Sequence, residues 1–305
     1  MVSAWPAGRI RLGPKVVVFV HFDRAGAVRE YAMIYLRAFA EAGFSIVFVT
    51  NSGRLQPAAM SALQQICACV LVRRNVGYDF GAWREGFAHL ALPRPDTELV
   101  VMANDSVYGP LRPLDDLLAQ IDFERADVWG LTESWQSRFH LQSYFLAFRP
   151  EVLASEAWRR FWTAVRPAPS KHWIIHRNEI GLTQALIRAG FRVQSVWPYT
   201  RLLQVVDPEL TDGEPSRDPV QQVRRDHARR IREAMVRQVP MNPTSDLWRQ
   251  LLLAGFPFIK RELLRSNPTQ VPDVAEWQDL VERLLQADPG PIERDLQRTL
   301  RNRAP

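Results

Sequence analysis

Four short runs of apolar, largely β-branched residues alternate with segments of helical periodicity in the first third of the chain. The runs cover residues 16–20, 45–50, 67–72 and 99–103. Continuous apolar runs of this length are typical of strands in a parallel sheet that is covered on both faces. The spacing of apolar residues between them predicts helices at residues 28–42, 57–65 and 82–90. This order predicts an α/β fold with a mostly parallel, Rossmann-like sheet flanked by helices.

Polar residues follow each of the four predicted strands. They are His21 and Asp23 after the first run, Asn51 after the second, Arg74 to Asp79 after the third, and Asn104, Asp105 and Ser106 after the fourth. Because the carboxyl ends of parallel strands lie at one edge of a sheet, we expect these side chains to lie close together. Open α/β sheets bind their ligands at that edge, so the sequence predicts a binding site there.

The alternation of strands and helices changes after Asp105. Further strands are expected at residues 128–132, 143–148 and 191–197, and further helices at 150–164 and 178–189. The first two of these strands are close enough in sequence to pair antiparallel. We expect one α/β domain, which carries the predicted binding site, over residues 1–204. Residues 205–305 are expected to form an Arg-rich linker, to about residue 240, and a C-terminal helical region that packs on that domain.

The composition indicates the expected cellular location and the classes of ligand that the protein could bind. No stretch of 18 apolar residues occurs, which argues against a membrane span. Residues 1–15 lack the apolar core of a signal peptide and are expected to be irregular, so the cytoplasm is the expected location. Cys67 and Cys69 are expected to be buried, reduced, structural thiols. The net charge of +6 favours phosphates or anionic surfaces, whereas nucleic acid is disfavoured because no known binding pattern for it occurs.

Five ordered motifs carry a family resemblance. They are NVGYDFGAW (75–83), NDSVYGP (104–110), HLQSYFLAF (140–148), NEIGLTQALIRAGF (178–191) and GFPFIKRELLRSNP (255–268). Together they resemble the rhamnan synthesis protein F family of bacterial glycosyltransferases, from about residue 15 to residue 270. The resemblance implies a GT-A-like fold and a nucleotide-sugar donor, commonly dTDP-L-rhamnose. It also implies as acceptor a growing, lipid-linked cell-surface polysaccharide of the lipopolysaccharide O-antigen or rhamnan type, at the cytoplasmic face of the inner membrane.

Asp105 is the candidate for the donor diphosphate. GT-A enzymes usually carry Asp-any-Asp at this place, where the carboxylates hold Mg²⁺ or Mn²⁺ and the ion neutralises the leaving diphosphate. Here the triplet is Asn104-Asp105-Ser106, so one usual carboxylate is missing. Metal dependence through Asp105 therefore stays open, and the cationic side chain of Arg74 is a candidate to share the task. The plainer alternative is that Asp105 caps the following turn.

The loop after the third strand is the second donor candidate. Gly77 permits close approach of the backbone, while Arg74, Asn75, Tyr78 and Asp79 offer groups for a base, ribose, phosphate or sugar hydroxyl. The loop has no G-x-G-x-x-G pattern and no P-loop lysine, which argues against NAD and ATP sites.

Residues after the first two strands complete the expected donor site. His21 and Asp23 are candidates for contact with the nucleotide base and ribose. Asn51 is a similar candidate after the second strand. A structural histidine and ordinary turn residues remain the alternatives.

Glu179 is the candidate catalytic base. Asn178 is placed to cap a helix that begins at Glu179, and the positive end of that helix would favour an ionised carboxylate. An inverting transferase, which the family suggests, needs one base to deprotonate the acceptor hydroxyl. His140, Gln142 and Ser143 are candidates for contact with the acceptor or sugar. The alternative for Glu179 is an ordinary acidic residue in a first helical turn.

Other functions remain open from the sequence. The same fold could use another nucleotide sugar, such as UDP-galactose, or the chain could be a non-catalytic carbohydrate-binding partner of a polysaccharide synthase complex. A Rossmann-type methyltransferase is disfavoured, because no Gly-rich turn follows the first strand. The basic, apolar segment 255–268 suggests peripheral membrane contact. Its plainer role is packing of Phe256, Phe258, Leu263 and Leu264 against the catalytic domain.

Overall fold

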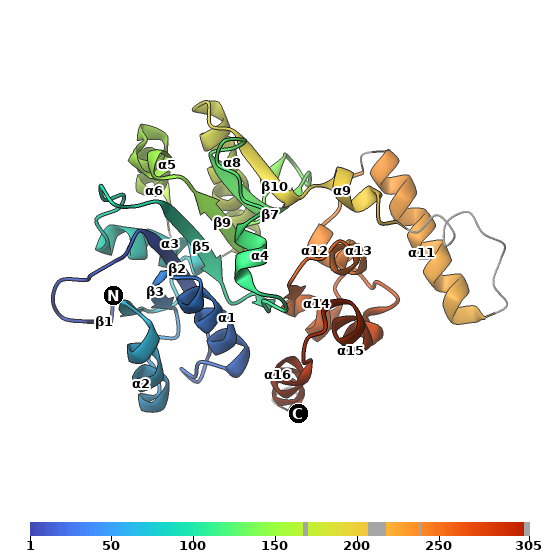
Figure 1. The fold of residues 1–305 in the computed structure, drawn as a ribbon, viewed down its shortest axis with the longest axis horizontal. Coiled ribbons are helices and arrows are strands. Elements are labelled where there is room, and N and C mark those ends of the chain that lie inside the picture. Colours follow the sequence, from blue (N-terminus) through green and yellow to red (C-terminus); the bar gives the residue numbers. More distant parts are fainter. Residues whose placement is uncertain (167–169, 207–217, 238, 302–305) are drawn as a thin grey trace. The chain divides into compact units, whose positions relative to one another are not determined.

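The computed structural model describes residues 1–166, 170–206, 218–237 and 239–301 (Figure 1). The chain divides into two compact units. Unit 1 comprises Met1–Asp105, Pro113–Leu131 and His140–Gln194, and unit 2 comprises Ser106–Arg112, Thr132–Phe139 and Ser195–Pro305. The expected domain division at residue 204 stays a prediction, because neither compact unit has been shown to fold as an independent domain.

The described residues form a nine-stranded sheet with the order β1-β4-β3-β2-β5-β9-β7-β10, in which β8 pairs with β7. In that order the strands are β1 Ser3–Trp5, β4 Cys69–Val72, β3 Ser45–Thr50, β2 Lys15–His21, β5 Leu99–Asn104, β9 Phe145–Phe148, β7 Val128–Ser134 and β10 Val193–Trp197, with β8 at His140–Leu141. Strands β4, β3, β2 and β5 run parallel, whereas β9 is antiparallel to both β5 and β7. The predicted α/β class, the parallel run and the antiparallel pair are confirmed.

Helices cover both faces of the parallel strands. Consecutive strand residues point to opposite faces, and Phe19 and Val18 of β2 show which helix lies on each. The Phe19 ring meets Tyr35 of α1 (Glu30–Glu41) edge-on, with 5.3 Å between ring centroids. Val18 lies against Gly86 of α3 (Tyr78–His89), where an added Cβ would come within 2.9 Å of Cγ1 of Val18. The valines of β2 are fully buried between these helices.

Several element boundaries differ from the expected ones. Residues 3–5, expected to be irregular, pair with β4 as an antiparallel edge strand. Helix α2 (Pro57–Ile66) ends with the Cys67 N–H bonded to the Leu63 carbonyl, so β4 begins at Cys69 rather than at residue 67. Helix α3 begins at Tyr78, four residues before the expected start, because Gly77 with φ +81° turns the chain into the helix.

The two cysteines are buried and free, as predicted. Burial raises the pKa of the Cys69 thiol to about 11, and burial followed by the neighbouring Cys69 raises the pKa of Cys67 further. Both side chains therefore stay protonated and unreactive near neutral pH.

Further helices of unit 1 follow β5 in the chain. They are α4 Leu114–Leu118, α5 Pro150–Ala154, α6 Glu156–Ala164, α7 Lys171–Ile174, a π-helix at Ile175–Glu179 and α8 Ile180–Arg188. The expected helix at 150–164 is divided at Ser155, whose extended backbone ends α5 and whose hydroxyl accepts the Trp158 N–H to begin α6.

Unit 2 is mostly helical. Its elements are β6 Val107–Tyr108, α9 Tyr199–Leu203, α11 Pro219–Val236, α12 Pro243–Asp246, α13 Trp248–Leu253, β11 Ile259–Lys260, α14 Arg261–Ser266, a 3₁₀-helix Val274–Glu276, α15 Trp277–Leu280, a π-helix Val281–Leu285 and α16 Gly290–Arg301. Residues 219–236 of the expected Arg-rich linker form α11, in which Ala228 and Ile231 are buried. No proline or glycine interrupts this stretch after Pro219. Residues 207–217 of the expected linker lie outside the described residues.

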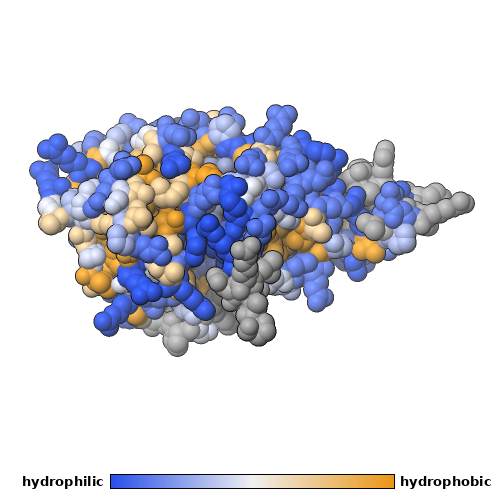
Figure 2. Space-filling view, turned by 90° about the horizontal axis from the view of Figure 1, so that it is seen from below, coloured by the Kyte–Doolittle hydropathy of each residue, from blue (hydrophilic) through white to orange (hydrophobic). Residues whose placement is uncertain are grey.

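The apolar residues of segment 255–268 are mostly interior. Phe256, Phe258 and Leu263 are at most 1% exposed, and Leu264 is half-buried. These residues are therefore mainly interior, and their packing against the catalytic domain stays a prediction. Figure 2 shows hydrophilic side chains interspersed with apolar ones over the face that it displays. Among the helices of the described residues, none has the length and apolar character needed to cross a bilayer.

Candidate functional site

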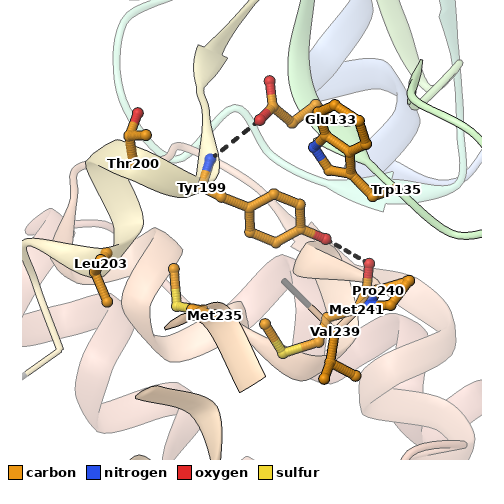
Figure 3. Close-up of a pocket in the computed structure, with 9 residues that line it drawn as sticks. All are labelled: Glu133, Trp135, Tyr199, Thr200, Leu203, Met235, Val239, Pro240 and Met241. Carbon is orange, nitrogen blue, oxygen red and sulfur yellow. Dashed lines mark hydrogen bonds between the residues drawn. The ribbon is translucent and has the colours of Figure 1, made fainter. Parts of the chain in front are cut away.

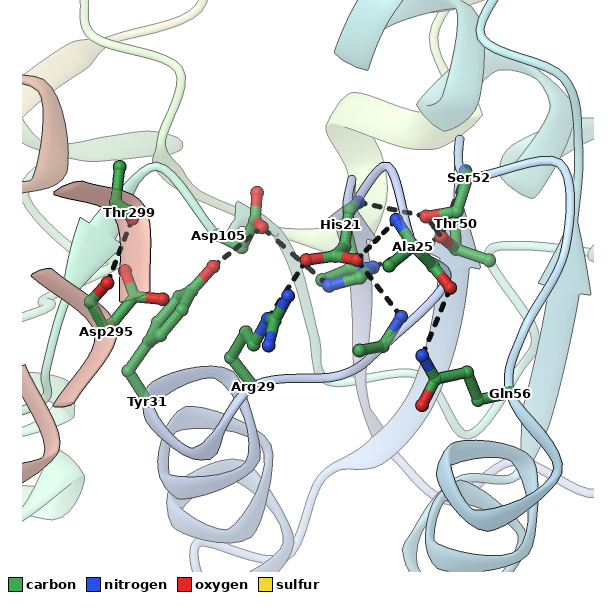
Figure 4. A network of polar contacts seen from close by, with 12 residues as sticks. His21, Ala25, Arg29, Tyr31, Thr50, Ser52, Gln56, Asp105, Asp295 and Thr299 are labelled. Atoms are coloured by element: carbon green, nitrogen blue, oxygen red, sulfur yellow. Dashed lines mark hydrogen bonds and ion pairs between the residues drawn. The ribbon is translucent and has the colours of Figure 1, made fainter. Parts of the chain in front are cut away.

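The ends of β2 and β3 are joined by polar contacts. Nδ1 of the buried His21 lies 3.1 Å from the Thr50 hydroxyl, and the Asn51 N–H donates to the His21 carbonyl at 2.8 Å. The Asp23 N–H donates to the Ser52 hydroxyl at 3.0 Å. The residues that follow the first two strands therefore lie together at the carboxyl edge of the sheet (Figure 4).

Asp105 joins the same edge from β5. Its N–H donates to the Val20 carbonyl at 3.1 Å, and its Oδ2 accepts the Tyr31 hydroxyl at 3.2 Å and lies 3.9 Å from Nε2 of His21 (Figure 4). The Asp105 side chain is 13% exposed, so it is fixed on one side and open to solvent on the other. Tyr31 was missed in the sequence because its helical spacing marked it only as core, although it is the second residue of the helix that follows β2.

Asp79 and Asn104 link the third and fourth strand ends. The amide of Asn104, which is 4% exposed, donates to Oδ2 of Asp79 at 2.9 Å. The Asn51 amide donates to the Tyr78 carbonyl at 3.2 Å. The structure thus brings Asn51, Asp79 and Asn104 into the group that contains His21 and Asp105, as the strand order predicts.

Arg73 holds the loop between β4 and α3. It is 3% exposed, and its guanidinium donates to the Val76 carbonyl at 2.7 Å, to Glu85 at 2.8 Å and to Oδ1 of Asn51. Arg73 was missed because a run of two arginines gives no sign of which one is buried. The other, Arg74, is exposed with Asn75, so both are accessible for a ligand.

Gly81 shows how tightly this loop is closed. A Cβ built on Gly81 would lie 2.4 Å from the Val76 carbonyl oxygen, which is too close for any side chain. Tyr78 has φ +51° and is 38% exposed, so its strained backbone places the ring at the surface. The loop therefore has a fixed shape in which an exposed aromatic ring precedes Asp79.

Asp23 has mainly local partners. Its carboxylate accepts the N–H groups of Ala25 at 2.8 Å and Ala27 at 3.2 Å, and Nε of Arg29 at 3.1 Å. Burial by itself would raise the pKa of Asp23, but these hydrogen bonds and the Arg29 charge lower it below the ordinary value. This geometry agrees with the turn-forming alternative, and a role of Asp23 in nucleotide contact stays a prediction.

Glu179 does not start a helix, so the expected cap by Asn178 is wrong. Asn178 and Glu179 end a π-helix, Ile175–Glu179, that lies between α7 and α8. Glu179, the residue directly before α8, itself has helical backbone angles and makes no side-chain capping bond. In the sequence, Asn178 and Glu179 match the pattern of a helix start. In the structure, helical backbone already begins at Lys171. Short π-helical turns within helices are frequent at functional sites.

The Glu179 carboxylate is nevertheless tied to the strand edge. Its Oε1 accepts the Ser143 N–H at 2.7 Å. The carbonyl of the next residue, Tyr144, accepts the Asn104 N–H at 3.2 Å. Glu179 is therefore connected to the end of β5 through residues 143 and 144, within unit 1.

The other acceptor candidates are less open. His140 is 4% exposed in β8, and Gln142 is 9% exposed. Between them, the Leu141 N–H donates to the Thr183 hydroxyl of α8 at 3.2 Å. Ser143 alone of the three is half-buried. Their roles in sugar contact stay predictions.

Few protein ligands for a metal ion lie at this edge of the sheet among the described residues. Across the part of the chain that the structure describes, no group of three or more His, Cys, Asp and Glu side chains is placed to hold a metal ion. The Asp79 carboxylate accepts from Asn104, and Asp105 accepts from Tyr31. Asp105 is the carboxylate that the sequence predicts for an ion here, and the other ligands of that ion would be phosphate oxygens and water, a set that Mg²⁺ tolerates.

Unit 2 contains a pocket of about 400 Å³ that no sequence-predicted site residue lines (Figure 3). Its walls are largely apolar and include Trp135, which is 52% exposed, and Tyr199, whose hydroxyl donates to the Met241 carbonyl at 2.5 Å. The one acidic lining residue, Glu133, accepts the Ser195 hydroxyl at 2.7 Å. The volume is within the range of small-molecule sites. Its residues are scattered over the sequence, so no motif signalled it.

Comparison with known families agrees with the motif-based resemblance. The family model described as Rhamnan synthesis protein F matches residues 46–210, and the resemblance is thereby confirmed. The virulence protein VirA of Vibrio anguillarum is 28% identical over 227 residues, which are 70% of this chain and 68% of that protein. The uncharacterized protein y4gN of Sinorhizobium fredii is 27% identical over 194 residues, 62% of this chain. The chain spans 50% of the length of y4gN.

Solved structures give weaker similarities. A putative nucleotide-diphospho-sugar transferase from Desulfovibrio desulfuricans has a TM-score of 0.37 at 13% identity, covering 75% of this chain and 100% of that one. The mannosyltransferase PcManGT from Pyrobaculum calidifontis, in complex with GDP-Man and Mn²⁺, has a TM-score of 0.36 at 13% identity, covering 88% and 74%. Staphylococcus aureus TarS 1–349 has a TM-score of 0.38 at 11% identity, covering 89% and 91%. These scores lie below 0.5, so they carry no conclusion about activity.

Proposed function

The chain belongs to the rhamnan synthesis protein F family, and from that premise we propose that it is a glycosyltransferase. It would transfer a sugar from a nucleotide donor to a growing cell-surface polysaccharide, and we take dTDP-L-rhamnose as the preferred donor. The observation that carries this proposal is the gathering of His21, Asn51, Asp79 and Asp105 at one sheet edge. That edge is where open α/β sheets bind nucleotides.

The donor is proposed to lie along the carboxyl ends of β2, β3, β4 and β5. Arg74 and Asn75 are exposed in the loop before α3 and supply a cation and an amide for phosphate and ribose oxygens. The Tyr78 ring, exposed beside them, offers a flat face for the base or sugar. Asp105 lies at the diphosphate, and a divalent ion bound there would supply positive charge to the leaving group.

Transfer with inversion requires a base on the acceptor side, and Glu179 is proposed for it. Glu179 takes the proton of the acceptor hydroxyl while the acceptor oxygen bonds to the anomeric carbon. The bond from that carbon to the donor phosphate breaks at the same time, and the nucleoside diphosphate leaves with the electron pair. The Ser143 N–H, 2.7 Å from Oε1, orients the carboxylate for this step.

Replacement of Glu179 by Gln tests the base. We expect Glu179→Gln to keep the donor affinity of the wild type and to lose about 10²–10⁴ in turnover, because the amide cannot accept the proton. Donor affinity is measured by calorimetry and turnover by release of nucleoside diphosphate. The matched control is Glu41→Gln, at the exposed end of α1, which should change neither quantity. Unchanged turnover in Glu179→Gln would remove the base from the proposal.

Two alternatives remain for the same site. The donor is open among nucleotide sugars, with UDP-galactose as the alternative to dTDP-L-rhamnose. The single carboxylate of Asn104-Asp105-Ser106 also suits a non-catalytic carbohydrate-binding partner of a synthase complex. A thermal-shift panel of dTDP-, UDP- and GDP-sugars, with and without Mn²⁺, separates the donors. Stabilisation without turnover on any acceptor would favour the non-catalytic alternative.

A peripheral location at the inner membrane is part of the proposal. Its support is the basic segment 255–268 together with the net charge of +6, since each basic residue near an anionic surface contributes about 1 kcal/mol. Cosedimentation of the protein with anionic vesicles, compared with neutral vesicles, tests it. Equal recovery from the two kinds of vesicle would remove this part.

A further inference from the structure

The pocket of unit 2 is formed by segments that are far apart in the chain (Figure 3). They are residues 133–135 at the end of β7, residues 199–203 of α9, Met235 near the end of α11, and residues 239–241. The residues that line the pocket all belong to unit 2, so it needs no contribution from unit 1. The proposed transfer at the sheet edge makes no use of it.

The carbonyl of Met241 holds the walls of the pocket together. It accepts the Tyr199 hydroxyl at 2.5 Å and the Ser134 hydroxyl at 3.2 Å. Ser134 and Met241 are both buried, so water competes little for the bond between them. Segment 239–241 is thereby fixed to both β7 and α9, and the pocket has its shape before a ligand binds.

Glu133 supplies the one charged group among the described residues that line the pocket. Its Oε2 accepts the Ser195 hydroxyl at 2.7 Å, and its Oε1 accepts the Tyr199 N–H at 3.4 Å. These bonds orient the half-buried carboxylate, and each oxygen has a second lone pair for a further donor. The pocket therefore suits a ligand that brings hydroxyl groups or other donors to this side.

Trp135 supplies an exposed aromatic surface at the same pocket. It is 52% exposed, and its ring centroid lies 5.1 Å from that of Phe139. Leu203 and Val239 also line the pocket and are 37% and 49% exposed. Exposed apolar side chains that gather around one hollow indicate a binding surface. The pocket thus combines exposed apolar walls with one oriented carboxylate.

This combination argues against two classes of ligand. A lipid chain would place hydrocarbon against the Glu133 carboxylate and take it out of water without a donor, which costs free energy. A nucleotide or other phosphate would meet the same negative charge, and the described lining residues include no lysine or arginine. A sugar ring has an apolar face of C–H groups and hydroxyl donors at its edge, so it matches both surfaces.

We propose that this pocket is a carbohydrate-binding site that holds a sugar residue of a saccharide chain. The C–H face of the sugar packs on the Trp135 indole, and two sugar hydroxyls donate to the Glu133 carboxylate. The exposed Thr200 hydroxyl is a further polar partner at the same pocket. Such binding requires neither a nucleotide donor nor sugar transfer, so the site goes beyond the proposed function.

Saturation-transfer difference NMR on the full chain tests this assignment. The probes are the methyl glycosides of L-rhamnose, D-galactose, D-glucose and D-mannose. Tetramethylammonium is added as an organic cation, since it would also bind an indole and a carboxylate. We expect the wild type to bind at least one glycoside. Trp135→Ala should weaken that glycoside by about tenfold or more, and Glu133→Gln by roughly three- to tenfold.

Trp173→Ala is the matched control. It makes the same substitution at another exposed tryptophan, which is 39% exposed in α7 of unit 1, and it should leave glycoside binding unchanged. Trp135→Phe keeps an aromatic ring and should retain part of the affinity. If Trp135→Ala fails to fold by circular dichroism, Trp135→Phe and Glu133→Gln decide the outcome.

Wild-type affinity for the glycoside in both Trp135→Ala and Glu133→Gln would overturn the assignment, as would absence of glycoside binding to the wild type. Binding of tetramethylammonium alone, lost in both variants, would overturn it in favour of an organic-cation site. Calorimetry with nucleotide sugars on the same proteins should show unchanged donor affinity in both variants. Absence of nucleotide-sugar binding to the wild type would instead overturn the proposed function and leave the carbohydrate site standing.

Discussion

Replacing Arg73 by Met removes the side chain that closes the proposed donor loop. Arg73 is 3% exposed, and its guanidinium bonds the Val76 carbonyl, Glu85 and Oδ1 of Asn51. Met is of similar length and leaves no large cavity, so the change isolates the polar contacts. The perturbation therefore tests whether one buried cation holds the ends of β3 and β4 and the start of α3.

The expected loss of stability follows from the groups that no longer have the guanidinium as a hydrogen-bond donor. Asn51 is 2% exposed, so its orphaned oxygen costs about 1–3 kcal/mol. Glu85 is 35% exposed, so its lost ion pair adds at most about 1 kcal/mol after solvent screening. The sum is about 1–4 kcal/mol of unfolding free energy, which corresponds to a fall of roughly 2–15 °C in the thermal midpoint.

The assay is differential scanning calorimetry, with chemical unfolding in urea as a second measure. Arg74→Met is the matched control, because the neighbouring arginine is exposed. It should leave the thermal midpoint within about 1 °C and act only on donor affinity. A midpoint for Arg73→Met equal to that of Arg74→Met would refute the claim that Arg73 holds the loop.

Two further predictions concern stability. Gly81→Ala places a Cβ 2.4 Å from the Val76 carbonyl oxygen and should lower the unfolding free energy in urea by about 1–3 kcal/mol. The control Gly8→Ala, whose Cβ would have nothing within 4 Å, should leave the stability unchanged. Equal stability of the two variants would show that the loop is not tightly closed. The pKa of Asp23 is lowered in the fold, so its stabilisation is full above the ordinary pKa of about 4 and is lost as the pH falls below that value. In Asp23→Asn the unfolding free energy should therefore fall less steeply than in the wild type as the pH is lowered from about 5 to 2. The same pH dependence in variant and wild type would exclude Asp23 as a contributor to acid-dependent stability.

The sequence predicted the parallel part of the fold well. Runs such as VVVFV and LVVMA cannot alternate between a core face and a solvent face, so they require a sheet covered on both sides. The edge that collects His21, Asn51, Asp79 and Asp105 then follows from the connectivity alone. The contacts of Asn104 with Asp79 and of Asp105 with His21 agree with that expectation.

Other features depend on contacts between segments far apart in the chain. The π-helix before α8 gives no periodicity signal that distinguishes it from a helix start at Asn178. The burial of Arg73 but not Arg74 is decided by Asn51 and Glu85, which lie on other elements. Lys260 meets Ser106 only because β11 pairs with β6, and two-residue strands are invisible to sequence patterns.

Hydrogen–deuterium exchange of the full chain, with and without nucleotide sugar, tests the proposed donor site most directly. Bound dTDP- or UDP-sugar should slow exchange in peptides that cover residues 21–29, 50–53, 73–81 and 104–108, since these contain the strand ends. Peptides of the unit 2 pocket around Trp135 and Tyr199 serve as the internal reference. Protection confined to those pocket peptides, with unchanged exchange at the four strand ends, would contradict the site.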